Sequence, residues 1–213
     1  MKWIWIAILP IFLWSCNQDG NTYAEIETEF GNIELKLYNS TPQHRDNFIK
    51  LVKESYYDDL LFHRVMGGFM IQGGDPDSKT ATSGQVLGGG GPGYTIPAEI
   101  GSVHFRGALA AARQPDRFNP QKESSGSQFF IVQGSPVTDQ QLDRIARSRG
   151  FTYGEAQRKL YKEIGGYPSL DGEYTVFGEV VKGMEVVDEI TKAAKDRNNR
   201  PLEDIRIKTI KIR

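Results

Sequence analysis

Cysteine and histidine are both scarce in this chain. Among its 213 residues there is one cysteine, Cys16, so no internal disulfide bond can form. The three histidines, His44, His63 and His104, lack the spacing of metal ligands, and we predict neither a metal site nor a cofactor. The chain also lacks a G-x-S-x-G motif that would carry a serine nucleophile. Hydrolytic chemistry is therefore not supported by the residues available.

An excess of charge of either sign is also missing. The chain has 26 basic and 27 acidic residues, and the two kinds are interspersed. This balance gives no support to nucleic-acid binding. There is no internal repeat and no low-complexity tract. The length beyond the first residues is enough for one domain with a sizeable core, which we expect to be a monomer.

Only one long apolar run is present, and it lies at the N-terminus. Residues Trp3 to Trp14 are almost wholly apolar, Lys2 precedes them, and a polar stretch follows Cys16. The run is shorter than the roughly 20 residues that span a bilayer, and its pattern is typical of a secretory signal peptide. Leu13-Trp14-Ser15-Cys16 is similar to the lipobox of bacterial lipoproteins, in which the cysteine is acylated. An ordinary signal peptide cleaved elsewhere is the alternative.

These features predict how the chain is divided and where it is located. Residues 1–16 form the signal peptide, residues 17–22 a short tether, and residues 23–213 the folded domain. If Cys16 is acylated, the protein is attached to a membrane through that residue. In either case we expect an exported protein of the cell envelope.

The domain begins with patterns typical of a β-hairpin and a helix. Residues 24–30 and 33–38 alternate between apolar and polar side chains, and Gly31-Asn32 between them indicates a turn. Thr41-Pro42 then predicts the start of a helix that ends near Ser55. Further strand-like and helix-like segments follow, with most strands alternating. This order favours an antiparallel barrel closed at its ends by helices.

Two stretches combine a strand-like apolar pattern with polar side chains that need partners. In residues 62–75, His63, Arg64 and Gln72 lie among apolar residues, and in residues 126–132 Gln128 precedes Phe129-Phe130. A buried arginine keeps its charge, so it is costly unless it meets an acceptor in the protein or in a ligand. We interpret the two stretches as walls of one pocket.

The sequences of these stretches carry a family resemblance. FHRVMGGFMIQGGD and GSQFFIV resemble the two signature strands of the cyclophilins, the peptidyl-prolyl cis/trans isomerases, and GGGGPGYTIPAE and LDGEYTVFGEVVKGMEVVD resemble further segments. The likeness runs from about Tyr23 to the last residue. It implies a mainly β fold, a closed antiparallel eight-stranded barrel capped by two helices. It also implies that proline-containing polypeptides are the partners, here exported proteins that are being folded.

The resemblance also implies site residues. Arg64, Gln72 and Phe69 are expected to be catalytic. The residues expected to bind substrate are His63, Met70, Ala112, Arg113, Gln128, Phe130, Leu170 and Tyr174. Ala112 and Arg113 fall where a peptide is held by main-chain hydrogen bonds. His63 is expected to be neutral and hydrogen-bonded within the fold. Ser169 and Tyr174 depart from the pattern, since many members have Trp and His at these positions.

Isomerisation of the bond before proline requires no nucleophile, metal or proton transfer, so the residues of the two stretches are sufficient for it. The barrier to rotation about the bond before proline is close to 20 kcal/mol because nitrogen donates its lone pair to the carbonyl. In the twisted state that lone pair can accept a hydrogen bond, which Arg64 could donate. The alternative is a membrane-tethered module or chaperone that binds proline-containing segments without turnover. The presence of Arg64, Phe69, Gln72 and Phe130 favours the enzyme.

Two segments stand apart from the signature strands. Residues 84–93 are rich in glycine, but no Lys-Ser/Thr follows, which favours a flexible surface loop beside the pocket over a phosphate-binding loop. Residues 134–168 are absent from a minimal cyclophilin and predict an inserted helical hairpin, with helices over 138–147 and 152–164. A capping box at Thr152 and Glu155 is expected to begin the second. The insertion either gates substrates or contacts a partner, or is a tolerated surface feature.

Overall fold

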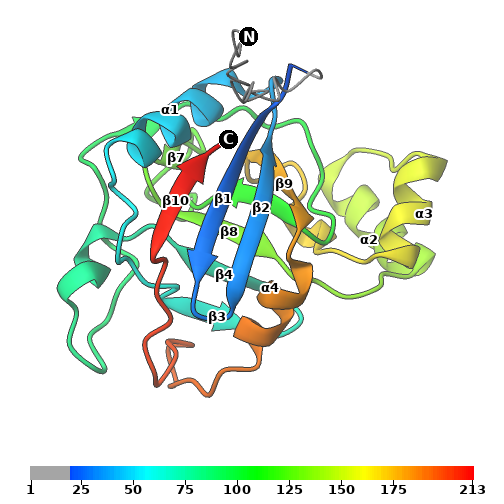
Figure 1. Ribbon diagram of the computed structural model, residues 1–213. Helices are drawn as coiled ribbons and strands as arrows, with labels where there is room; N and C mark the ends of the chain where they lie inside the picture. Colours follow the sequence, from blue (N-terminus) through cyan, green and yellow to red (C-terminus); the bar gives the residue numbers. More distant parts are fainter. Residues whose placement is uncertain (1–19) are drawn as a thin grey trace, which may run out of the picture.

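An antiparallel sheet of eight strands, in the order β10-β1-β2-β9-β6-β8-β4-β3, forms the body of the protein (Figure 1). The computed structural model describes residues 20–213, so the predicted signal peptide and Cys16 lie outside the described residues. The strands are β1 (Thr22–Thr28), β2 (Gly31–Leu37), β3 (Arg64–Met66), β4 (Met70–Gly73), β6 (Ala108–Ala111), β8 (Phe129–Val132), β9 (Val176–Lys182) and β10 (Thr209–Ile212). Two short strands, β5 (Thr95–Ile96) and β7 (Ser124–Ser125), pair separately.

The first hairpin is confirmed, but its turn lies two residues earlier than predicted. β1 and β2 pair along their whole length, and Glu29-Phe30 forms the loop. Gly31 is the first residue of β2, with φ +125°. The Thr28 hydroxyl donates to the Gly31 carbonyl (2.8 Å) and accepts from the Phe30 N–H (3.0 Å). The side chain of Thr28 therefore closes the loop, which the alternation pattern could not indicate.

Helices α1 (Pro42–Lys53) and α4 (Met184–Thr191) lie at opposite ends of the curled sheet (Figure 1). Pro42 is the first residue of α1, as predicted, and Thr41 is its N-cap. Phe48 is buried and lies edge-on to Phe129 of β8, with ring centroids 5.8 Å apart. The main core lies between the sheet and these two helices, which leaves the other sheet face free for a site.

The sheet does not show the closed barrel that the sequence predicts. Within residues 20–213 its edge strands, β10 and β3, are not paired with each other as strands. The segments that precede them do meet. Phe62 N–H donates to the Ile205 carbonyl (2.9 Å), and Ile207 N–H donates to the Leu60 carbonyl (2.8 Å). β10 begins only at Thr209, so the result is a curled half-barrel.

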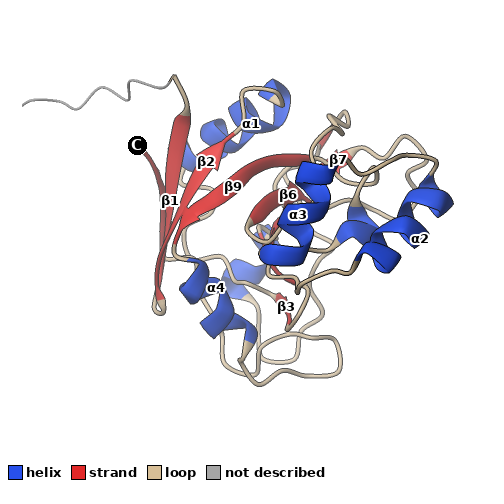
Figure 2. Cartoon of the chain, turned by 90° about the vertical axis from the view of Figure 1, so that its right-hand side faces the viewer, coloured by secondary structure: helices blue, strands red, loops and turns tan. Residues whose placement is uncertain are grey.

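The predicted helical hairpin is present on the side of the body away from β1 (Figure 2). It consists of α2 (Asp139–Arg149) and α3 (Glu155–Glu163). Thr138 and Gln141 form a capping box at the start of α2. The capping box predicted at Thr152 is wrong. α3 has Gly154 as its N-cap, and the Gln157 side chain accepts from the Gly154 N–H (3.0 Å).

The hairpin has a small core of its own, which buries Leu142, Tyr153 and Tyr161 beside Val137. The chain then returns to the sheet through a short 3-10 segment, η2 (Pro168–Leu170). Another such segment, η1 (Pro76–Thr80), lies earlier in the chain, after β4. No helix of the described part, residues 20–213, has both the length and the apolar character needed to cross a membrane.

Candidate functional site

One cavity of about 140 Å³ brings together nine of the eleven predicted site residues in the described region. It is lined by Arg64, Phe69, Met70, Gln72, Ala112, Arg113, Phe130, Leu170 and Tyr174. The strands β3, β4 and β8, the turn between β3 and β4, the residues after β6, and η2 with the residues after it supply these side chains. Gln128 lies in an adjoining hollow, and His63 lies outside the cavity.

Strand register places the central residues side by side. Arg64 of β3 pairs with Gln72 of β4, which in turn pairs with Phe130 of β8. Since paired residues point to the same face of a sheet, the three side chains form one row. Ile71 and Ile131, one position along, point to the opposite face and are fully buried in the main core. A slip of one residue would therefore exchange the site for the core.

Within residues 20–213, the positive charge of the Arg64 guanidinium is not paired with a carboxylate. It donates to Oε1 of Gln72 (3.2 Å) and to the sulfur of Met66 (3.3 Å), and it lies 5.7 Å from the centroid of the Phe69 ring. Among the ion pairs of residues 20–213, none involves Arg64. A guanidinium has five N–H donors, so several remain for a ligand in the cavity.

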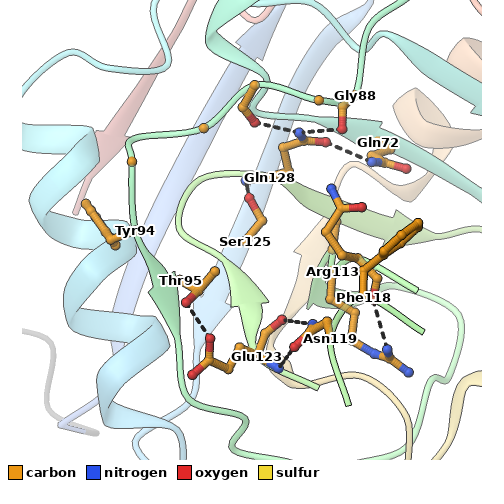
Figure 3. Close-up of a pocket in the computed structure, with 16 residues that line it drawn as sticks. Gln72, Gly88, Tyr94, Thr95, Arg113, Phe118, Asn119, Glu123, Ser125 and Gln128 are labelled. Atoms are coloured by element: carbon orange, nitrogen blue, oxygen red, sulfur yellow. Dashed lines mark hydrogen bonds between the residues drawn. The ribbon is translucent and has the colours of Figure 1, made fainter. Parts of the chain in front are cut away.

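A relay of amides fixes the direction in which Gln72 points. Its Nε2 donates to Oε1 of Gln128 (3.0 Å), and Nε2 of Gln128 donates to the carbonyls of Gly88 (3.0 Å) and Gly90 (2.8 Å). Both donors of Gln128 are therefore directed at the glycine-rich loop (Figure 3). Oε1 of Gln72 must consequently face Arg64. From the sequence, Gln128 was expected to bind substrate, and this chain of contacts was not predicted.

Asp75, which the sequence did not single out, holds the glycine-rich loop in place. Its Oδ2 accepts from the N–H groups of Gly88 (2.5 Å) and Gly90 (3.4 Å). A Cβ on Gly90 would lie 2.2 Å from Oδ1 of Asp75, so any larger residue there would displace this carboxylate. The loop does lie beside the pocket as predicted, and these contacts tie it to the end of β4. In the sequence, the only indication of this role is that Asp75 directly follows Gly73-Gly74.

A second, larger hollow of about 620 Å³ adjoins the first (Figure 3). Gln72, Ala112 and Arg113 line both. The remaining walls are the glycine-rich loop and the residues Tyr94, Thr95, Gln114, Phe118, Asn119, Glu123, Ser125 and Gln128. An extended chain could therefore cross from one hollow to the other over Ala112 and Arg113.

The side chain of Arg113 belongs to the wall rather than to solvent. Its guanidinium donates to the Glu173 carbonyl (2.8 Å) and carboxylate (3.0 Å) and lies 4.7 Å from the centroid of the Tyr174 ring. The main chain of Ala112 is also occupied, since its N–H donates to Gln128 and its carbonyl accepts from Ser125. Main-chain contacts with a peptide therefore fall chiefly to Arg113.

Aromatic rings form the floor of the smaller cavity. The Phe130 ring meets the Tyr174 ring edge-on, with centroids 5.7 Å apart, and His104 stacks behind it at 6.1 Å. Phe69 packs against Tyr167, with centroids 4.2 Å apart. His104 and Tyr167 were not predicted to support the site. Neither belongs to a signature strand, and contact across the fold is not visible in a linear pattern.

His63 lies on the far side of Arg64, in a separate hollow of about 220 Å³. Burial lowers the pKa of His63 to about 4, although the Asp75 carboxylate opposes this effect. The imidazole is therefore neutral near pH 7, as predicted. Within residues 20–213, however, neither ring nitrogen has a hydrogen-bond partner. The same region contains no group of three His, Cys, Asp or Glu side chains that could hold a metal ion.

Acid is expected to destabilise the fold through His63. Because its pKa is about 4 in the fold against 6.5 normally, the unfolded state binds more protons between these pH values, and stability falls as the pH drops through them. The wild type should lose about 2 kcal/mol more unfolding free energy than His63→Gln between pH 7 and pH 4.5. Urea unfolding of both proteins at the two pH values measures the difference, and equal losses would contradict it.

A protein-family model and several individual proteins are similar in sequence to this chain. A family model described as "Cyclophilin type peptidyl-prolyl cis-trans isomerase/CLD" matches residues 23–212. A Staphylococcus aureus protein with the provisional name peptidyl-prolyl cis-trans isomerase is 33% identical over 196 residues, which cover 92% of this chain and 93% of the relative. A relative from Staphylococcus haemolyticus with the same name is 31% identical over the same length.

Solved structures agree with these sequence relatives. The crystal structure of a Cryptosporidium parvum cyclophilin type peptidyl-prolyl cis-trans isomerase is similar, with a TM-score of 0.65 and 25% identity over 91% of this chain and 98% of that chain. A second structure, obtained in the presence of the dipeptide Ala-Pro, has a TM-score of 0.64 at 25% identity over 90% and 98% of the two chains.

Proposed function

Because this chain belongs to the cyclophilin-type peptidyl-prolyl cis-trans isomerase family, we propose that its isomerase activity resides in the cavity beside Arg64 and serves the folding of exported proteins. The chain is a peptidyl-prolyl cis-trans isomerase. The observation that carries the assignment of the site is the position of Arg64. Its guanidinium, which has no ion-pair partner in residues 20–213, lines the cavity beside the side chains of Phe69 and Phe130 and is held by Gln72.

The mechanism needs only a donor that is already in place. As the bond before proline twists, its nitrogen regains a lone pair, and a guanidinium N–H of Arg64 donates to it. The charge of Arg64 is permanent, so the donor is present at every accessible pH. Gln72 keeps the guanidinium oriented before the substrate arrives. Catalysis thus follows from stabilising the twisted state more than the planar one.

The apolar residues of the cavity hold the proline ring. Phe69, Met70, Phe130 and Leu170 form the seat, and the neighbouring residues of the peptide pass over Ala112 and Arg113 toward the larger hollow. The similar Cryptosporidium parvum protein was crystallised in the presence of Ala-Pro, which supports binding of proline-containing peptides here. The test is the rate of cis-to-trans exchange in a short Xaa-Pro peptide, with the wild type and with Arg64→Ala.

We further propose that the enzyme is an exported, monomeric lipoprotein of the cell envelope. The support comes from the sequence, in which an apolar run from Trp3 to Trp14 precedes the lipobox-like Leu13-Trp14-Ser15-Cys16. Acylation at Cys16 would place the isomerase beside polypeptides emerging from the membrane. With more than one acyl chain the attachment would be stable, since a single chain binds only marginally.

Anchoring is expected to depend on Cys16. In cells expressing the full chain, the wild type should sediment with membranes and incorporate labelled fatty acid. Cys16→Ser should incorporate none and should lose most of its membrane retention, because the acyl chains supply most of the binding free energy. A Cys16→Ser protein that remains fully in the membrane fraction would contradict the proposal. Ser15→Ala serves as the control, since it keeps a small residue before the cysteine.

A further inference from the structure

The inserted hairpin contacts the wall of the isomerase site at a buried carboxylate. Asp171 is 1% exposed and follows Leu170, which lines the cavity. Its Oδ2 accepts hydrogen bonds from the hydroxyls of Tyr153 (2.7 Å) and Tyr161 (2.6 Å), both of which belong to the insertion. A surface insertion that is merely tolerated would not need two hydrogen bonds to a buried carboxylate of the site wall.

The same carboxylate also holds a ring behind the proline seat. Oδ1 of Asp171 accepts from the main-chain N–H of His104 (2.7 Å) and lies 2.9 Å from its Nδ1. The imidazole of His104 stacks on the Phe130 ring, with 11° between the ring planes. Asp171 therefore links the two inserted tyrosines to Leu170, which precedes it in the chain, and to His104, which stacks on Phe130.

A second contact from the insertion reaches this wall on both sides of Asp171. Arg149, the last residue of α2, forms an ion pair with Glu173 and donates to the Ser169 carbonyl (3.0 Å). Glu173 is also bound by Arg113, whose guanidinium covers the Tyr174 ring. The segment from Ser169 to Tyr174 is thus held at both ends by residues of the hairpin.

The two hydroxyls remain donors at every relevant pH. Burial raises the pKa of Tyr153, and its hydrogen bond to Asp171 raises it further. Burial likewise raises the pKa of Tyr161, and the charge of Asp171 adds to the effect. A buried carboxylate needs such donors, because an ionised group without partners is costly in the interior. The hairpin and the wall therefore form one hydrogen-bonded unit.

We propose that Tyr153, Tyr161 and Arg149 are positioning residues of the isomerase, through which the inserted hairpin sets the seat of the proline ring. The proposal rests on the isomerase function given above. Leu170 and Tyr174 line the cavity and would contact the bound peptide in both the planar and the twisted state of the peptide bond, so their displacement would weaken the binding of both states alike. Such uniform binding is measured as a rise in KM with little change in kcat. Loss of the Arg64 donor lowers kcat instead.

The test compares full kinetics of Tyr153→Phe, Tyr161→Phe and the double variant in the full chain. Each variant removes one hydroxyl and keeps the aromatic ring. We expect KM for a short Xaa-Pro peptide to rise about fivefold or more in the double variant, with kcat within about twofold of wild type. A purely structural role would lower the amount of folded enzyme, and so apparent kcat, and leave KM unchanged.

Lys162→Gln is the matched control within the hairpin. Lys162 joins α3 to Asp139 of α2 (3.0 Å) and touches no residue of the wall, so KM should stay at the wild-type value. If the double variant does not fold, Arg149→Gln gives the same test at a partly exposed contact and should raise KM about twofold. An unchanged KM in the folded variants overturns the proposal. A wild type without any acceleration overturns the isomerase function itself.

Discussion

Replacement of Arg64 by alanine is expected to lower kcat for proline isomerisation about 100-fold to 1,000-fold, the loss seen when a single preorganised donor is removed from a transition state. The change leaves KM nearly unaltered, because the hydrogen bond to the prolyl nitrogen forms only in the twisted state. Exchange NMR on a short Xaa-Pro peptide measures the rate. Circular dichroism of the same sample establishes that the variant is folded.

Two further substitutions make this prediction specific. Arg64→Lys keeps the charge but loses the planar fork that both contacts Gln72 and reaches the substrate, so it should recover only a small part of the rate. Arg106→Ala removes an arginine that pairs with Asp188 and does not line the cavity, and the rate should stay near wild type. An Arg64→Ala protein within tenfold of wild type would show that another group stabilises the twisted bond.

Replacement of Asp171 by alanine should destabilise the fold by about 3–5 kcal/mol, because it leaves several buried donors without an acceptor. The donors are the hydroxyls of Tyr153 and Tyr161 and the main-chain N–H and Nδ1 of His104. For a domain of this size the melting temperature should fall by about 10 °C or more. Denaturant unfolding followed by fluorescence gives the free energy directly.

Asp143→Ala is the matched control for this change. Asp143 is also a carboxylate of the inserted region, but it is 45% exposed, and within residues 20–213 its one ion pair is with Arg158. Its loss should cost about 1 kcal/mol or less, as for other exposed ion pairs. Asp171→Asn keeps one acceptor oxygen, so its loss of unfolding free energy should lie between those of Asp171→Ala and Asp143→Ala. If Asp171→Ala lowers the free energy of unfolding by less than Asp143→Ala does, the buried contacts contribute little to stability.

The sequence predicted the site better than it predicted the closure of the fold. Arg64, Gln72 and Phe130 were expected in one pocket because polar side chains interrupted two apolar strands, and strand register does bring them together. The turn at residues 31–32 and the capping box at Thr152 were wrong by two residues each. In both places a local side chain, Thr28 or Gln157, decided the geometry. Barrel closure was not shown, because β10 begins late.

The supporting residues could not be predicted in the same way. Asp171 is joined to His104 across 67 residues of sequence, and Gln72 to Gln128 across 56. Periodicity reports only which face of an element is apolar, so it cannot show which buried carboxylate meets which donor. The insertion illustrates this limit. Its helices were predicted from their pattern, whereas their attachment to the wall required the three-dimensional arrangement.

The most direct test of the account is cis-trans exchange NMR at equilibrium, with a short Xaa-Pro peptide and the folded wild-type protein in catalytic amount. The spontaneous reaction takes tens to hundreds of seconds at 25 °C, so exchange peaks between the two isomers are absent without a catalyst. We predict that the protein produces these peaks and that saturation with a second proline peptide suppresses them. A folded protein that binds the peptide but produces no exchange would contradict the account and would favour a binding module without turnover.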